Sequence, residues 1–421
     1  MKGFVLGGGL AGLSAAMELS KHCDEVTVFE KENYLGGLSS SYDIEGYMIP
    51  KFYRHVIDTD KATFDLLETL KIRDKFLPKN VKFGIYDQKH DKIFQLSGSK
   101  LLFFKPLSFL DRVKFGFFVL NLILTGDNLE ELDKINAEIW LTNKADEGVS
   151  KFFGKLIAEH KFAIPFKEIS AAWMYSRFKL EISKSKFMYY PAGKKGFDLL
   201  IDGLKDRIKG KILRQTPVEK IFIENTRVKE IVCKKKRFTI KNDDLVVNTL
   251  PIPIFLKICK GLPENQKKKL EKIQYAANVC LCFGCKENLA DYYWMNIMGN
   301  VPFGTVINHN NIYDEYPWKI IYASNYVSQN DPILKKSDKE ILNLYVKHLE
   351  KIFKKNIKPL WYRISKSYHA TPIFRTNFFE LIPNNREFEN LRFAGPYMTY
   401  PEDRTMGLSI GSGITAVKQF I

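Results

Sequence analysis

The alternation of hydrophobic and polar positions divides the chain into elements, beginning with a strand, a helix and a second strand. An apolar run at residues 3–6 leads through a glycine-rich turn into a helical pattern at residues 13–21. A second apolar run at residues 25–30 ends in an acid. Strands and helices that alternate in this way usually form a parallel sheet covered by helices, so the N-terminal segment predicts an α/β domain.

The pattern changes twice along the rest of the chain. Residues 61–72 have apolar positions at helical spacing, residues 81–98 alternate as in a hairpin, and residues 101–186 are helical and rich in aromatic side chains. Alternating helices and strands return over residues 191–258, and strand-like segments follow at residues 273–330. A capping box from Ser337 to Glu340 begins an amphipathic helix, and residues 391–395 form a last strand before a closing helix at residues 408–420.

The turn after the first strand reads Gly-Gly-Gly-Leu-Ala-Gly over residues 7–12 and fits the phosphate-binding turn of a dinucleotide site. Gly7 permits the tight turn, Gly9 leaves room for a pyrophosphate, and Gly12 allows the helix to pack closely on the strand. The free N–H groups at the helix N-terminus favour an anion. Glu30, 18 residues after Gly12, can bind both hydroxyls of a ribose and repels a 2′-phosphate, which disfavours NADP.

The residues after Glu30 point to the kind of dinucleotide. Residues 30–38, Glu-Lys-Glu-Asn-Tyr-Leu-Gly-Gly-Leu, resemble the FAD-binding extension of the flavin amine oxidase, phytoene desaturase and protoporphyrinogen oxidase superfamily. Residues 191–221 resemble its second FAD segment, residues 245–251 resemble its Val-Val-x-Thr-x-Pro strand, which ends near the cofactor, and residues 391–413 resemble its C-terminal flavin clamp. The resemblance implies FAD as the cofactor. The cofactor-binding residues expected from the glycine turn and the resemblance are Gly7, Gly9, Leu10, Ala11, Gly12, Glu30, Lys31, Gly36, Gly37, Leu38, Val218, Thr249, Gly395, Gly407 and Leu408.

The order of these segments predicts a doubly wound, Rossmann-like FAD-binding domain that is discontinuous in sequence. We expect residues 1–57, 191–258 and 390–421 to form this domain, and residues 58–190 and 259–389 to form an inserted α+β substrate domain. One position departs from the resemblance, because the superfamily usually has Gly-Asp after the last strand, whereas Gly395 is followed by Pro396. Glu402, Asp403 and a backbone N–H are the candidates for the role of that acid.

Composition adds a large positive charge. The 421 residues include 65 basic and 48 acidic ones, for a net charge of +17, and the basic residues are spread along the chain. This charge fits a solvated surface, or attraction to an anionic lipid or substrate; we find no nucleic-acid-binding module. Cys280, Cys282 and Cys285 lie in an apolar run without a nearby histidine, so we interpret them as buried structural cysteines and expect no metal.

Two segments bear on localisation. Lys2 and the apolar residues after it imitate a signal peptide, but cleavage would remove the glycine turn, so we expect a cytoplasmic protein. The apolar residues 115–124 are too few to span a bilayer. Together with residues 101–107 they could form a monotopic membrane foot, which would associate the protein with a membrane, or a buried helix of the substrate domain.

Candidate catalytic groups are the basic residues expected near the isoalloxazine ring. Lys51, Arg54 and His55 follow the second glycine pair, and Arg404 precedes the closing helix. A cation at these positions could stabilise reduced flavin or hold an anionic substrate. The residues expected to line the substrate cleft are Arg177, Tyr189, His309 and Tyr322.

We therefore expect an FAD-dependent oxidoreductase that acts on a small molecule, either hydrophobic or anionic. The leading hypothesis is removal of a hydride from a largely apolar substrate of isoprenoid or lipid, porphyrinogen or amine type, with formation of a C=C or C=N bond. The alternative is a non-redox flavoenzyme similar to UDP-galactopyranose mutase, in which the same basic residues would bind the diphosphate of a nucleotide sugar.

Overall fold

The computed structural model describes residues 1–420 except 97, 184–186 and 235, and its first body is built on a five-stranded parallel sheet. The strand order is β10-β2-β1-β14-β21, and the residue ranges are β1 (Lys2–Leu6), β2 (Glu25–Phe29), β10 (Gly210–Leu213), β14 (Leu245–Asn248) and β21 (Leu391–Phe393). Gly3 of the central strand pairs with Val26 on one side and Leu245 on the other. Strands from three distant stretches therefore form one sheet, and the predicted α/β class is confirmed.

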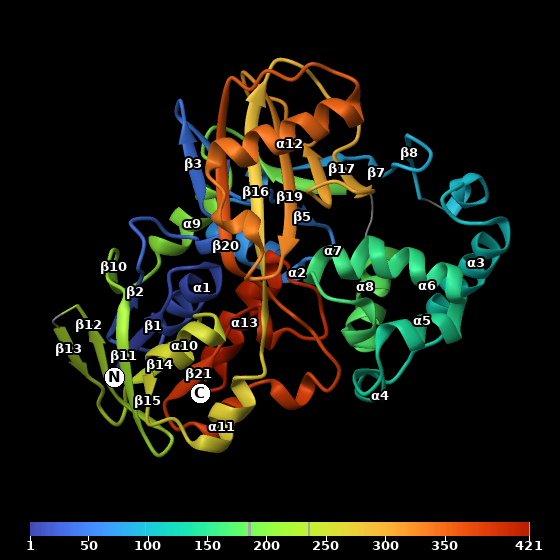
Figure 1. The fold of residues 1–421 in the computed structure, drawn as a ribbon. Helices are drawn as coiled ribbons and strands as arrows, with labels where there is room; N and C mark the ends of the chain where they lie inside the picture. The colour runs from blue at the N-terminus through green and yellow to red at the C-terminus, as the bar shows by residue number, and fades with distance from the viewer. Residues whose placement is uncertain (97, 184–186, 235, 421) are drawn as a thin grey trace.

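The first and last helices cover one face of this sheet side by side (Figure 1). They are α1 (Leu10–Leu19) and α13 (Met406–Lys418), and α2 (Lys61–Leu70) and α9 (Asp198–Lys205) pack beside them. A Cβ on Gly413 would lie 2.1 Å from the carbonyl oxygen of Ala11, so only glycine permits this distance between α1 and α13. The N-terminal glycine turn is thus held from behind by the C-terminal helix.

A small antiparallel sheet extends the first body. Its order is β13-β12-β11-β15, with β11 (Val218–Glu224), β12 (Arg227–Cys233), β13 (Lys236–Thr239) and β15 (Cys259–Lys260). Phe238 of β13 packs edge-on against Phe29 of β2 at 5.0 Å between ring centroids. Helices α10 (Ile252–Ile258) and α11 (Glu264–Leu270) complete this body.

A seven-stranded sheet forms the second body, above the first in Figure 1. Its order is β20-β16-β19-β18-β17-β7-β8, with β7 (Phe83–Asp87), β8 (Lys92–Phe94), β16 (Tyr275–Cys285), β17 (Trp294–Met298), β18 (Thr305–Asn308), β19 (Lys319–Val327) and β20 (Trp361–Pro372). Helix α12 (Asp338–Phe353) packs on it and begins with the predicted capping box of Ser337 and Glu340. Cys280, Cys282 and Cys285 are fully buried in β16, which agrees with their interpretation as structural cysteines.

Short strands connect the two bodies. They form the hairpin of β3 (Ser41–Ile44) and β4 (Tyr47–Pro50), which turns at Glu45 and Gly46, and the sheet of β5 (Val56–Ile57), β9 (Phe187–Pro191) and β6 (Phe76–Asn80). The predicted hairpin at residues 81–98 is also confirmed, as β7 and β8, although β7 pairs in addition with β17 in parallel. The segment after the second glycine pair therefore runs from the first body into the second.

The aromatic-rich insert folds into a helical lobe at one side of the molecule (Figure 1). Its helices are α3 (Phe109–Leu124), α4 (Leu129–Asp133), α5 (Ala137–Ala145), α6 (Glu147–Phe153), α7 (His160–Phe162) and α8 (Ala171–Ser183), preceded by the short helical turn η3 (Gly98–Phe103). Phe115, Phe118, Phe153, Phe178 and Trp140 pack together in its core. Within the described residues, none of the helices is long and apolar enough to cross a membrane.

Candidate cofactor and substrate site

The glycine turn after β1 forms one side of an open cradle. A Cβ on Gly12 would lie 1.9 Å from the carbonyl oxygen of Gly7, so α1 can follow the turn this closely only with glycine there. A Cβ on Gly9 would meet nothing closer than the Cα of Gly37 at 4.0 Å, so Gly9 faces empty space. The first N–H groups of α1 lack partners within the helix and favour an anion in that space.

The second glycine pair forms the other side of the cradle. The N–H of Gly36 donates to the carbonyl oxygen of Gly8 at 2.8 Å, and a Cβ on Gly37 would lie 3.2 Å from the Cα of Gly9. The buried carboxylate of Glu30 accepts hydrogen bonds from the N–H groups of Gly8 and Glu32, each at 2.8 Å. An acid, a helix N-terminus and a gap without side chains thus lie together, and a dinucleotide such as FAD requires this combination.

Other residues expected to contact the cofactor lie around this cradle. The hydroxyl of Thr249 donates to the carbonyl oxygen of Leu6 at 2.8 Å, directly below the turn. Val218 is half-buried at the start of β11, and Leu10 and Ala11 are buried in the first turn of α1. Lys31 differs, because its exposed ammonium pairs with Glu32 at 3.3 Å rather than pointing into the cradle.

The predicted C-terminal clamp has its backbone donors already engaged. The N–H of Gly407 donates to Asp60 Oδ2, and the N–H of Leu408 donates to Thr405 Oγ1, each at 3.1 Å. The N–H of Gly395 donates to Ser412 Oγ at 3.0 Å. Sequence reasoning missed Asp60, because it lies just before the amphipathic helix α2 and resembles an ordinary helix cap. Burial raises the pKa of this carboxyl.

A small cavity lies beyond Leu38, the residue after the second glycine pair, and therefore next to the cradle. It is narrow, with a volume of about 30 Å³. Its walls come from both bodies: Leu38, Phe52, Tyr53, Arg54, Asn278, Ser324, Tyr326, Ala370 and Arg404. Of the catalytic candidates predicted from the sequence, Arg54 and Arg404 line this cavity.

The two arginines are fixed by neutral groups. Arg54 Nη2 donates to the carbonyl oxygen of Leu38 at 2.6 Å. Arg404 donates to the hydroxyl of Tyr326 at 2.9 Å and to the carbonyl oxygen of Ala370. The Nε atoms of both arginines are shielded from solvent without a hydrogen-bond partner, and no carboxylate of the described residues forms an ion pair with either side chain. Burial, and then repulsion by Arg404, lower the pKa of Arg54 to about 10.

The nearest buried carboxylate, that of Asp403, is already neutralised by the helical lobe. Asp403 accepts from Lys161 Nζ at 2.5 Å and from Arg177 Nη1 at 3.0 Å, and Arg177 also pairs with Glu181 at 2.5 Å. Burial by itself raises the pKa of Asp403, but the attraction of Lys161 and Arg177 outweighs it and lowers the pKa to about 2. Asp403 therefore joins the lobe to the first body through these two ion pairs.

Comparison with known families agrees with this geometry. A family model described as flavin containing amine oxidoreductase matches residues 10–421, nearly the whole chain. The chain belongs to this family. Its cofactor is accordingly FAD, and the protein is an FAD-dependent oxidoreductase.

Solved structures share the fold of this flavin-containing amine oxidoreductase with little sequence identity. A protein named as a protoporphyrinogen oxidase from Exiguobacterium sp. 255-15 is 16% identical with a TM-score of 0.77, over 99% of this chain and 98% of that one. An oxidoreductase from Methanosarcina mazei is 18% identical with a TM-score of 0.76, over the full length of both chains. Reduced UDP-galactopyranose mutase is 14% identical with a TM-score of 0.74, over 99% of this chain and 93% of that one. At these identities the likeness concerns the fold alone.

Two other catalytic candidates of this flavin-containing amine oxidoreductase lie outside the described cavity wall. The ammonium of Lys51 lies 3.1 Å from the ring centroid of Tyr34, and burial lowers the pKa of Lys51. His55 Nδ1 forms a hydrogen bond with the hydroxyl of Tyr293 at 2.9 Å, and its ring also packs on Trp294. Both residues therefore flank the segment that carries Arg54.

The predicted substrate residues are also absent from that wall. Arg177 pairs with Asp403, and Tyr189 packs on Phe64 at 5.0 Å between ring centroids. Tyr322 is fully buried and donates to the carbonyl oxygen of Pro50 at 2.8 Å. His309 is fully buried among tyrosines, and burial lowers its pKa to about 3, so its ring is neutral. These positions were predicted from residue type, which does not distinguish an aromatic core from a cleft.

Proposed function

We propose that the enzyme removes a hydride from a largely apolar substrate that carries an anionic group, forming a C=C or C=N bond. The observation that supports this is the position of Arg54 and Arg404, which line the cavity next to the FAD cradle and form no ion pair with a carboxylate of the described residues. Both arginines are half-buried and have no ion-pair partner among the described residues, so a bound anion would stabilise this arrangement. The wall between the two arginines includes Leu38, Phe52 and Tyr53, which suits the apolar part of such a substrate.

The charge of the cavity also separates the substrate types that the sequence left open. A protonated amine would be repelled by two guanidinium groups, whereas a carboxylate or phosphate would be attracted to them. A lipid or isoprenoid acid, or a porphyrinogen with carboxylate side chains, therefore matches the charge of the cavity wall better than an amine does.

The chain's own residues would bind, orient and exclude water. FAD, when bound, supplies the hydride acceptor. The open side of Gly9 would receive the pyrophosphate, and Glu30 the hydroxyls of the adenosine ribose. Arg54, held by Leu38, and Arg404, held by Tyr326 and Ala370, would bind the anionic group of the substrate and keep the reacting carbon in one orientation.

The test compares an acid with its methyl ester. The FAD-loaded enzyme is mixed anaerobically with saturated lipid acids or porphyrinogens, or with their esters, and flavin absorbance is followed near its visible maximum. We expect the acids to bleach the flavin and Arg404→Gln to raise KM for the acid by about 10- to 100-fold, as for loss of a charge-assisted hydrogen bond. The ester should be affected little, and Arg363→Gln, an exposed arginine of β20, serves as the matched control.

Two results would contradict the proposal. One is equal reaction of acid and ester in the unaltered enzyme; the other is an Arg404→Gln variant that keeps its full FAD content and reacts with the acid as before. Faster reaction with a simple amine than with any acid would also place the substrate in the opposite charge class.

A second candidate function rests on the same two arginines. In this candidate function the two arginines bind the diphosphate of a nucleotide sugar. The activity would then be similar to that of UDP-galactopyranose mutase, whose reduced form shares this fold. For this candidate, activity would require enzyme reduced beforehand, consume no electrons overall, and yield a sugar with an isomerised ring. That combination of results would replace the oxidoreductase proposal.

A further inference from the structure

Helix α3 is apolar on two opposite sides, and one of them has no partner within the described structure. Phe115, Phe118 and Leu122 point into the lobe and are buried. The other side is exposed, where a solvent-facing helix surface is normally polar. We call it the α3 face: Leu102 and Phe103 of η3 with Phe109, Leu110, Phe117, Leu120, Ile123 and Leu124 of α3, whose exposed fractions run from 49% at Leu120 to 77% at Phe103.

These side chains form one continuous surface. Leu110, Phe117, Leu120 and Leu124 follow one another at spacings of seven, three and four residues, and so share one side of the helix. The turn η3 packs against α3, and Arg112 of the helix donates to the carbonyl oxygen of Leu102. Figure 1 shows α3 at the outer edge of the helical lobe, away from the parallel sheet. Exposed apolar patches of this kind mark an interaction site.

The charge around the α3 face is positive. Lys100, Lys105 and Arg112 lie on or next to it, whereas Lys114 pairs with Asp146, and Asp111 is the one acid between residues 100 and 125. Asp111 is engaged in the helix cap, where its carboxylate accepts from the hydroxyl of Ser108 at 2.6 Å. A basic rim around an apolar helix face is complementary to anionic lipid headgroups above acyl chains.

We propose that the α3 face docks the enzyme on a bilayer that contains anionic lipid. Helix α3 would lie in the plane of the interface, because its 16 residues fall short of the bilayer thickness. A second copy of the chain is a poorer occupant, since a symmetric pair would bring two basic rims together. The same lobe carries Lys161 and Arg177, which bind Asp403 of the first body, so docking would attach the rest of the enzyme to the membrane through this lobe.

The experiment measures vesicle binding by the full-length, FAD-loaded protein. The probes are phosphatidylcholine vesicles with and without about one third phosphatidylglycerol, at about 0.1 M salt, where screening leaves surface attraction measurable. We expect co-sedimentation with the anionic vesicles and a fall in binding of at least about tenfold for Phe117→Glu. Leu360→Glu is the matched control, because Leu360 is 53% exposed but outside the α3 face, and it should bind as the unaltered protein does.

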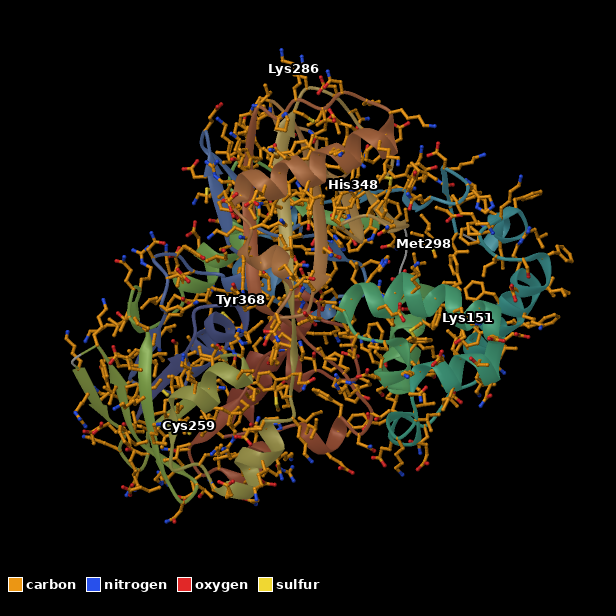
Figure 2. The ribbon with its side chains drawn as sticks, in the orientation of Figure 1. Lys151, Cys259, Lys286, Met298, His348 and Tyr368 are labelled. Carbon is orange, nitrogen blue, oxygen red and sulfur yellow. The ribbon has the colours of Figure 1, made fainter. Side chains whose placement is uncertain are left out.

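A second matched pair tests the charge. Lys105→Glu should weaken binding to anionic vesicles by several-fold, about the effect of removing a cation near a charged surface. Lys286→Glu should leave vesicle binding unchanged. Figure 2 shows Lys286 at the far end of the seven-stranded sheet, away from the helical lobe on which Lys151 is labelled. Flavin absorbance and circular dichroism confirm that each variant is folded.

Three outcomes would overturn the proposal. The first is no binding of the unaltered protein to anionic vesicles. The second is a folded Phe117→Glu variant that binds them as well as the Leu360→Glu variant does. The third is a dimer in the absence of lipid that Phe117→Glu converts to a monomer without changing vesicle binding, which would assign the α3 face to a second copy of the chain.

Discussion

Replacing Asp403 by asparagine should destabilise the junction between the helical lobe and the first body. Asp403 is 7% exposed and holds both Lys161 and Arg177, so the variant leaves two cations there without their shared counter-ion. The pKa of Asp403 falls from 3.8 to about 2, and at about 1.4 kcal/mol per pKa unit this corresponds to roughly 2.5 kcal/mol. Loss of one partner from a buried ion pair typically costs about 3–5 kcal/mol, so we expect about 2–4 kcal/mol.

The pH dependence follows from the direction of the shift. A carboxyl whose pKa is lower in the folded state stabilises the fold above its unfolded pKa, here 3.8, and the stabilisation is lost as the pH falls towards about 2. At pH 7 the unaltered enzyme therefore has the full contribution, and the Asp403→Asn variant lacks it. Below about pH 3 the two proteins should become more alike in stability.

The assay is urea unfolding of the FAD-loaded protein at pH 7 and at lower pH, followed by flavin fluorescence and circular dichroism. Asp206→Asn is the matched control, because the side chain of Asp206 is 68% exposed and its pairing with Lys205 should contribute less than about 1 kcal/mol. The reasoning is refuted if Asp403→Asn unfolds within about 0.5 kcal/mol of the unaltered protein at pH 7, the range of an ordinary surface substitution.

Three further predictions concern the cradle and the two sheets. Gly9→Val should keep the fold, because a Cβ there meets nothing within 4.0 Å except Gly37 Cα, but the purified variant should lack FAD. Gly126→Val, which is also in open space, should retain FAD. A fully yellow Gly9→Val protein would contradict the assignment of the cradle. The unaltered protein should lose stability as the pH falls from 6.5 to about 3, because in this range His309 binds a proton when the chain is unfolded but stays neutral when it is folded. His309→Phe should remove this part of the loss, and equal acid unfolding curves for the two proteins would contradict the prediction. Ser337→Ala should lower the stability of α12 by about 1 kcal/mol in thermal unfolding by removing its capping box, whereas an unchanged midpoint would mean that the cap contributes nothing.

The sequence predicted the parts of the molecule that depend on local geometry. The glycine turn, Glu30 and the second glycine pair lie within 40 residues, and each has a backbone requirement that few other residues meet. The fold class and the cofactor followed from them and are confirmed. The domain boundaries and the individual site residues stay predictions.

The cavity depended on contacts that no local pattern records. Arg54 and Arg404 were expected near the ring, but their lack of a carboxylate partner follows from Asp403 being engaged by Lys161, a residue of the lobe that carried no motif. His309 and Tyr322 are fully buried, and polar aromatic residues on strand-like segments are found in a core as well as in a cleft, so their place at the substrate stays a prediction. Only the tertiary structure separates these cases.

The order of strands has a consequence for synthesis of the chain. Central strand β1 lies between β2 and β14, and β21 completes the sheet from nearly four hundred residues later. At about 5–20 residues per second, roughly 20–80 s separate the appearance of β1 from that of β21 and α13. Throughout that interval the glycine turn lacks the helix that supports it from behind, so ribosome-bound chains stalled before Leu391 should not retain FAD. Cofactor capture should therefore follow the synthesis of β21 and α13, and the N-terminal strands must be kept from pairing wrongly until then.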